Sequence, residues 1–146
     1  MRTADVIMTV IAVIGLGWTL ATECRSAETV VKHSSTTAVQ SITDADFADK
    51  ALANGITVVE FSSNWCMPCR ELKPIYEQVC GDCKGAKFYQ FNIVDGSKAD
   101  ERYKITKIPC VIIFKDGREI ARKLGHELLV TDAREKFVAW IAENAK

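Results

Sequence analysis

The amino-acid sequence predicts an α/β domain in which helices cover both faces of a central mixed, mostly parallel β-sheet. Short apolar runs rich in β-branched residues, such as ITVVEF and CVIIF, are too short for helices and predict buried strands. Segments with helical periodicity alternate with these runs, as in proteins built around a parallel sheet. The 146 residues suffice for one domain, and 19 basic residues balance 19 acidic ones, which gives no sign of a nucleic-acid binder.

The N-terminal residues are expected to lie outside this domain. The segment VIMTVIAVIGLGWTLA, residues 6–21, carries no charge. Its length is near the upper limit for a signal-peptide core and short of the roughly 20 residues that a spanning helix needs. We therefore expect residues 1–21 to be a signal peptide or a membrane anchor, in preference to a buried core helix. Residues 22–37 are polar and Ser/Thr-rich, which is typical of a linker.

Residues 38–146 begin with a predicted helix, strand and second helix. Thr43 and Asp46 form a helix-start signal, and Asn54-Gly55 ends that helix. Residues 56–61 predict a strand buried on both faces. Residues 67–79 predict a helix that contains Pro74 as a kink.

The second half of the domain continues this alternation. Residues 87–93 predict a strand, residues 97–103 a short helix, and residues 110–114 a third strand. Asp116-Gly117 is a hairpin turn into REIARKL. The last helix is amphipathic and places Ala133, Phe137, Trp140 and Ile141 on one face.

Two cysteines stand between the first strand and the second helix, in WCMPC. At the start of a helix, unpaired N–H groups and the helix dipole favour a thiolate, which is the attacking species in disulfide exchange. The spacing of Cys66 and Cys69 lets the second sulfur displace a mixed disulfide from the first. A zinc site needs about four ligands, but Cys80 and Cys83 follow on the same helix roughly 15 Å away. The pattern therefore favours a redox-active dithiol over a metal site or an inert disulfide.

The segments VVEFSSNWCMPCRELKP and KITKIPCVIIFKDGREIARKLG resemble thioredoxin, over about residues 38–146. This resemblance implies a thioredoxin fold and a thiol–disulfide oxidoreductase acting on protein disulfides. It implies that Cys66 is the exposed nucleophile, that Cys69 is the resolving thiol, and that a cis Pro109 packs against them. The residues expected to contact substrate are Trp65, Met67, Pro68, Ile108, Cys110, Gly125 and His126.

The sequence also departs from the family pattern. Met67-Pro68 replaces the usual Gly-Pro, and because this dipeptide helps to set the reduction potential, the direction of electron flow is left open. Glu60 stands where the family has a buried aspartate, and Gln90 stands where a lysine usually pairs with it. We expect Glu60 to be buried, with a raised pKa, and to exchange a proton with Cys69. A surface carboxylate at a strand end is the alternative.

Roles for the remaining cysteines and for His126 stay open. Cys80 and Cys83 are expected to form a local disulfide or to remain spectators, with a second redox relay as the alternative. Cys110 is either a small buried residue or a third thiol close to Cys66. His126 is either a solvated loop residue or a cation that favours the Cys66 thiolate.

The sequence as a whole predicts an exported oxidoreductase, in a bacterial periplasm, tethered to the inner membrane or secreted after signal cleavage. It is expected to act as a monomeric reductase of protein disulfides without a cofactor, which implies a transmembrane electron donor. The alternative is a soft-metal module in which Cys66, Cys69 and Cys110 hold copper or zinc. A redox-inactive adaptor is a third possibility, against which both retained cysteines argue.

Overall fold

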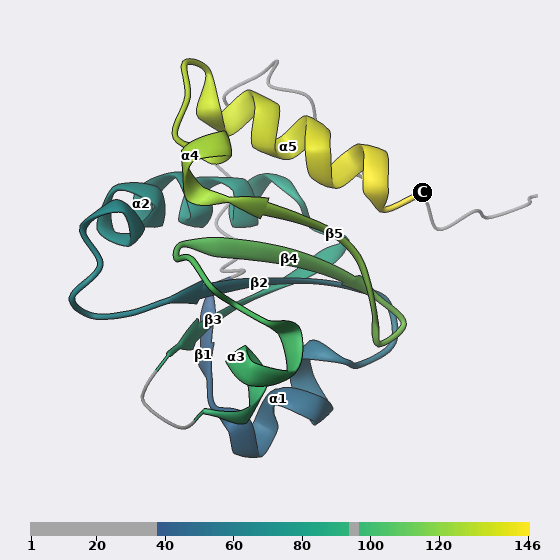
Figure 1. Cartoon of the computed structure of the whole chain (residues 1–146). Coiled ribbons are helices and arrows are strands. Elements are labelled where there is room, and N and C mark those ends of the chain that lie inside the picture. Colours follow the sequence, from purple (N-terminus) through teal and green to yellow (C-terminus); the bar gives the residue numbers. More distant parts are fainter. Residues whose placement is uncertain (1–37, 94–96) are drawn as a thin grey trace, which may run out of the picture.

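The computed structural model describes residues 38–93 and 97–146, and Figure 1 shows a single sheet between two layers of helices. The strands are β1 (Gln40–Ile42), β2 (Ile56–Ser62), β3 (Ala86–Asn92), β4 (Cys110–Lys115) and β5 (Arg118–Leu124). The helices are α1 (Asp44–Ala51), α2 (Met67–Asp82), α3 (Lys98–Tyr103), α4 (Gly125–Leu128) and α5 (Ala133–Asn144).

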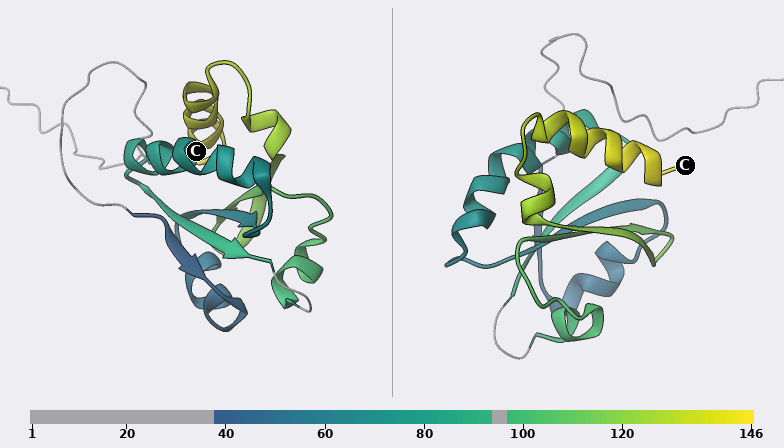
Figure 2. Two further views of the ribbon diagram at one scale, coloured as in Figure 1. Left: turned by 90° about the vertical axis from the view of Figure 1, so that its left-hand side faces the viewer. Right: turned by 45° about the horizontal axis from the view of Figure 1, so that its top comes forward.

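The five strands lie in the order β1-β3-β2-β4-β5. β3 pairs in parallel with β1 and β2, whereas β4 pairs antiparallel with β2 and β5. The sheet is therefore mixed, and α2, α4 and α5 cover one face while α1 and α3 cover the other (Figures 1 and 2). All seven residues of β2 are buried, because this central strand lies between the two layers.

Helix α2, which carries the two cysteines at its start, is fixed to the sheet by Tyr76. The Tyr76 hydroxyl lies 2.9 Å from the carbonyl oxygen of Val58 on β2 and 3.0 Å from that of Tyr89 on β3. At its other end, Asp82 forms an ion pair with Arg134 of α5, with 2.8 Å between Oδ2 and Nε. These contacts give α2 a defined position above the end of β2.

An aromatic cluster fills the opposite side of the sheet. The rings of Phe47, Phe61, Phe91, Tyr103 and Phe114 lie with centroids 5.2 to 6.4 Å apart in seven pairs that join α1 and α3 to the sheet. Such pairs add to the stability that burial of the rings provides. The cluster packs against the face of β2 that lies opposite α2. The strand that leads into the cysteine pair is therefore packed on both faces.

The predicted elements are present, with shifts of a few residues at their ends. The helix start at Thr43 is confirmed, because its N–H donates to Asp46 Oδ1 at 2.6 Å. The hairpin turn is confirmed by positive φ angles of 50° at Asp116 and 78° at Gly117. The kink expected at Pro74 does not interrupt the helix, since α2 continues to Asp82. The sequence analysis missed β1 and α4, which have three and four residues.

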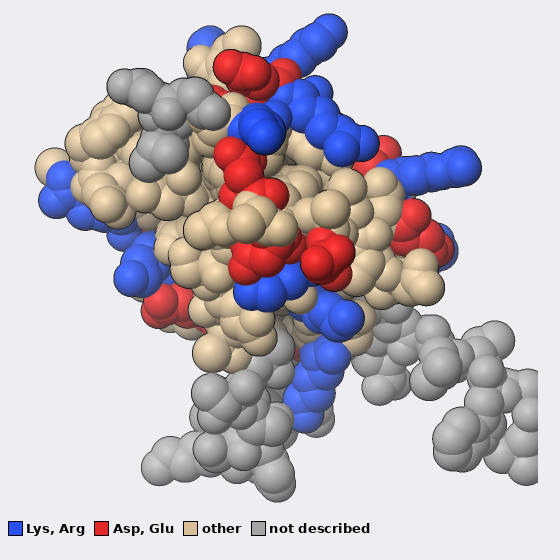
Figure 3. All heavy atoms as spheres, turned by 90° about the horizontal axis from the view of Figure 1, so that it is seen from below, with Lys and Arg blue, Asp and Glu red and all other residues tan. Residues whose placement is uncertain are grey.

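The surface carries both signs of charge. On the face seen in Figure 3, Lys and Arg side chains are interspersed with Asp and Glu, so this face has no extended patch of one sign. Within residues 38–93 and 97–146, no helix is both long and apolar enough to cross a membrane. The apolar run at residues 6–21 and the linker at residues 22–37 lie outside the described residues.

Candidate active site

Several predicted site residues meet at one end of the sheet because of the strand pairing. Phe61, near the carboxyl end of β2, lies opposite Cys110 at the start of β4, and Cys110 lies opposite Leu124 at the end of β5. The loop to Cys66, the segment that ends at Pro109 and the start of α4 therefore emerge at the same end. The topology thus brings together residues that are far apart in the sequence.

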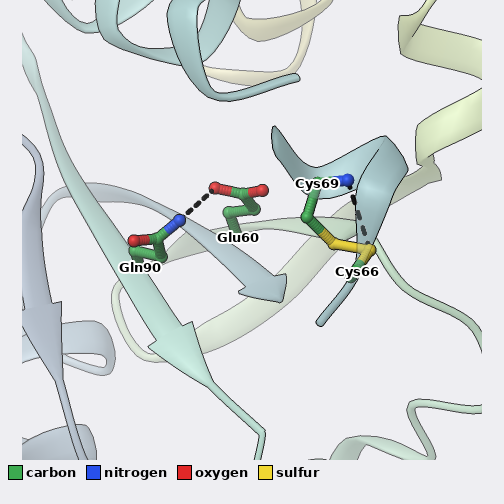
Figure 4. Close-up of a disulfide and its surroundings, with 4 residues drawn as sticks. All are labelled: Glu60, Cys66, Cys69 and Gln90. Carbon is green, nitrogen blue, oxygen red and sulfur yellow. Dashed lines mark hydrogen bonds between the residues drawn. A yellow bond between two sulfur atoms is a disulfide. The ribbon is translucent and has the colours of Figure 1, made fainter. Parts of the chain in front are cut away.

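The two cysteines form a disulfide across the start of α2. Cys66 is the N-cap residue, and its Sγ lies 2.14 Å from Sγ of Cys69, with 5.3 Å between the Cα atoms. The backbone N–H of Cys69 donates to Sγ of Cys66 at 3.2 Å, as Figure 4 shows. In the reduced protein, the same N–H groups would stabilise a thiolate on Cys66. Pro68 occupies the first turn, where its missing N–H leaves no hydrogen bond broken.

Cys66 is less exposed than the resemblance implies. Its relative exposure is 5%, against 3% for Cys69, while the neighbouring Trp65 and Met67 are 76% and 59% exposed. The sulfur is covered because Cys66 caps the helix and is bonded to Cys69. Trp65 and Met67 therefore present exposed apolar surface beside the disulfide, which suits contact with an apolar segment of a protein substrate.

Pro109 is held by Gly125, which begins α4. The Ile108–Pro109 peptide bond is cis, as the resemblance implies, and the N–H of Gly125 donates to the Pro109 carbonyl oxygen at 2.7 Å. A Cβ atom on residue 125 would lie 2.3 Å from Cγ and 2.7 Å from Cδ of Pro109. Only glycine therefore fits at this position. Ile108 is half-buried, and His126 is exposed beside Gly125.

Glu60 is fully buried in β2, so the alternative of a surface carboxylate is excluded. Its Oε2 accepts a hydrogen bond of 3.0 Å from Nε2 of Gln90, whereas its Oε1 is buried without a hydrogen-bond partner. Burial raises the pKa of Glu60 to about 7, although the Gln90 amide and the charge of Lys73 oppose the shift. Figure 4 shows Oε1 on the side of the carboxyl group that faces Cys69.

Three further cysteines in the described part of the chain lie in the core. Cys110 is 1% exposed, and burial raises the pKa of its thiol. Cys80 and Cys83 are also buried. The local disulfide or spectator role expected for this pair stays a prediction. Helix α2 continues through Cys80 to Asp82, and burial raises the pKa of Cys80 to about 11, which disfavours the thiolate that exchange needs.

The soft-metal alternative receives no support from the geometry. In the described part of the chain, no three His, Cys, Asp or Glu side chains are close enough together to hold a metal ion. Cys110 therefore does not complete a three-cysteine site with Cys66 and Cys69.

One residue of the site was missed by the sequence analysis. The carbonyl oxygen of Ser63 accepts the N–H of Cys66 at 3.2 Å, and its buried hydroxyl has no hydrogen-bond partner among the described residues. Ser63 lies three residues before Cys66, the residue expected at the start of the helix, and this spacing was the signal that could have identified it.

The sequence of this chain is similar to those of known thioredoxins. The thioredoxin family model matches residues 38–143. The chain is 40% identical over 77 residues to a thioredoxin of Chlamydia pneumoniae, covering 53% of this chain and 76% of the relative. It is 31% identical over 91 residues to a thioredoxin of Staphylococcus aureus, covering 62% and 86%.

Solved structures share the fold. A thioredoxin of Malassezia sympodialis superposes with a TM-score of 0.64 at 22% identity, covering 82% of this chain and 99% of that one. Spinach chloroplast thioredoxin f gives a TM-score of 0.63 at 18% identity, covering 75% and 87%. The matching family model, the identity to thioredoxins and the disulfide at the start of α2 lead to one conclusion: the chain belongs to the thioredoxin family and is a thioredoxin-like protein-disulfide oxidoreductase.

Proposed function

We propose that this protein reduces protein disulfides outside the cytosol, while its N-terminal segment directs it to the membrane. The observation that carries the redox role is the disulfide at the start of α2, with the carboxyl group of Glu60 buried behind it. The apolar run at residues 6–21 supports export.

In the first step, the thiolate of Cys66 attacks one sulfur of the substrate disulfide. A bond forms between Cys66 and that sulfur, and the other substrate sulfur leaves as a thiolate and takes a proton. The N-cap position activates Cys66, because the helix start favours its negative charge. The apolar surfaces of Trp65 and Met67 hold the substrate segment beside it.

In the second step, Cys69 attacks the sulfur of Cys66. The Cys66–Cys69 disulfide forms, and the second substrate sulfur leaves as a thiolate. Cys69 must lose its proton to attack, and the carboxylate of Glu60 accepts it. Because the pKa of Glu60 is about 7, its carboxyl group can both take up and return a proton near neutral pH. The substrate gains two electrons and two protons, and the dithiol becomes the disulfide.

A reductase outside the cytosol must be reduced again after each cycle. We infer that a membrane-embedded dithiol carrier supplies the two electrons, because cytosolic reductants do not reach this compartment. The N-terminal segment would hold the domain close to such a carrier. The protein is expected to work as a monomer, since one chain contains the complete dithiol site.

The reduction potential of the Cys66–Cys69 pair tests the direction of exchange. Equilibration of the full chain with glutathione should give a value near that of thioredoxin, about −270 mV. A value above roughly −150 mV would indicate an oxidase and contradict the proposal. Met67→Gly is the matched variant, because it restores the family dipeptide and shows how far Met67 moves the potential.

Compartment is tested separately by labelling intact bacteria that express the full chain. A membrane-impermeant maleimide should modify Cys66 and Cys69 after mild reduction. Labelling only after the cytoplasmic membrane is permeabilised would contradict export.

A further inference from the structure

We propose that Gln90 is a positioning residue for the proton transfer at Glu60, holding the carboxyl group in both of its protonation states with one oxygen turned toward Cys69. This inference rests on the acid–base role proposed above for Glu60. It assigns a function to a residue whose side chain touches neither the substrate nor the cysteines.

The strand pairing places Gln90 beside Glu60. The two residues are direct neighbours in the parallel pairing of β2 and β3, so their side chains point to the same face of the sheet, toward α2. Gln90 is half-buried, and its Nε2 donates to Oε2 of Glu60 over 3.0 Å. This contact fixes Oε2 on the β3 side and leaves Oε1 on the side of Cys69, as Figure 4 shows.

An amide can serve both protonation states of a carboxyl group. Its NH2 group donates to a carboxylate, and its carbonyl oxygen accepts from a carboxylic acid. The terminal torsion of glutamine has a broad, roughly two-fold profile, so a half-turn exchanges the two groups without moving the strand. Gln90 can therefore remain bonded to Glu60 before and after the proton moves. A lysine at this position could only donate, and its charge would favour the carboxylate.

The charged side chains that affect the pKa of Glu60 come from α2, and their effects on that pKa have opposite signs. Lys73 lowers its pKa and Glu77 raises it, and both side chains are exposed. The Tyr76 hydroxyl is directed to the carbonyl oxygens of β2 and β3. On β4, the residue paired with Glu60 is the uncharged Val111. Within the described residues, Gln90 is thus the one hydrogen-bond partner of the Glu60 side chain.

Titration of Glu60 gives a test that does not depend on activity. We would follow its carboxyl carbon by NMR across pH in the reduced full chain, in the wild type, Gln90→Lys and Gln90→Met. The Lys variant should lower the pKa of Glu60 by at least about 1, and the Met variant, which is similar in size but cannot donate, should raise it. Gln78→Lys, the same change at an exposed position of α2, should leave it unchanged.

The kinetic test measures the rate of mixed-disulfide resolution against pH. Gln90→Lys should move the midpoint of the profile to lower pH, and Gln90→Met should slow resolution about 10-fold even at its optimal pH. In a Glu60→Gln background, neither change should alter the profile, because the group that Gln90 positions is gone.

Unchanged titration of Glu60 and unchanged profiles in both Gln90 variants would overturn the inference. Failure of the proposed function has a different signature. A potential above roughly −150 mV, or resolution unaffected by Glu60→Gln, would remove the reductase or acid–base role while the titration of Glu60 still responded to Gln90.

Discussion

Replacing Glu60 with Gln should change how the stability of the fold depends on pH. Glu60 is fully buried, and burial raises its pKa to about 7, whereas a glutamate in an unfolded chain has a pKa of about 4.3. The folded protein therefore retains a proton on Glu60 at pH values where the unfolded chain has lost it. Glu60→Gln keeps a neutral side chain of similar shape at every pH.

The magnitude follows from the two pKa values. Each pKa unit corresponds to about 1.4 kcal/mol, so ionising Glu60 in the folded state costs about 4 kcal/mol of stability in full. The sign is set by the raised folded-state pKa: stability is fully present below about pH 4.3 and is lost as the pH rises to about 7. The free energy of unfolding of the wild type should thus fall by about 2 to 3 kcal/mol, relative to Glu60→Gln, between pH 5 and pH 8.

Urea unfolding of the oxidised full chain at several pH values measures this difference. The control is Glu71→Gln, which removes an exposed carboxylate from helix α2 and should run parallel to the wild type. If Glu60→Gln also ran parallel to the wild type from pH 5 to pH 8, the pKa of Glu60 would not be raised, and the reasoning would be refuted.

Three further predictions concern exchange, packing and export. Glu60→Gln should slow mixed-disulfide resolution by about 10- to 1000-fold but change the first attack much less, as stopped-flow kinetics with a peptide disulfide would show; equal rates in both proteins would exclude acid–base catalysis by Glu60. Gly125→Ala should lower the free energy of unfolding by about 1 to 3 kcal/mol because its Cβ would overlap Pro109, whereas Gly81→Ala, with open space around it, should not destabilise the fold; equal unfolding curves would contradict this packing argument. Residues 38–146 made alone should be soluble, and the full chain expressed in bacteria should be found outside the cytosol; recovery of unprocessed full chain in the cytosolic fraction alone would contradict export.

Much of the fold could be predicted because the segments with an apolar pattern in the sequence are the ones buried in the structure. The apolar run at residues 56–61 occupies the centre of the sheet, where both faces are covered. The burial of Glu60 was predictable for the same reason, since it lies within that run. β1 was missed because only Ile42 of its three residues is buried, which leaves no alternation for a pattern to detect.

Other features of the site depend on pairing between distant segments. The contact of Gln90 with Glu60 follows from the register of β2 and β3, which the periodicity of either strand does not specify. The fit of Gly125 against Pro109 likewise depends on how the end of β5 meets the start of β4.

The central claim is that Cys66 attacks the substrate and Cys69 resolves the mixed disulfide, and trapping measures this most directly. The full chain carrying Cys69→Ser, incubated with a protein disulfide, should accumulate a reducible covalent complex through Cys66, identified by mass spectrometry. Cys66→Ser should form no such complex and should not reduce the substrate. Accumulation of the complex by Cys66→Ser, with normal turnover by Cys69→Ser, would contradict the account.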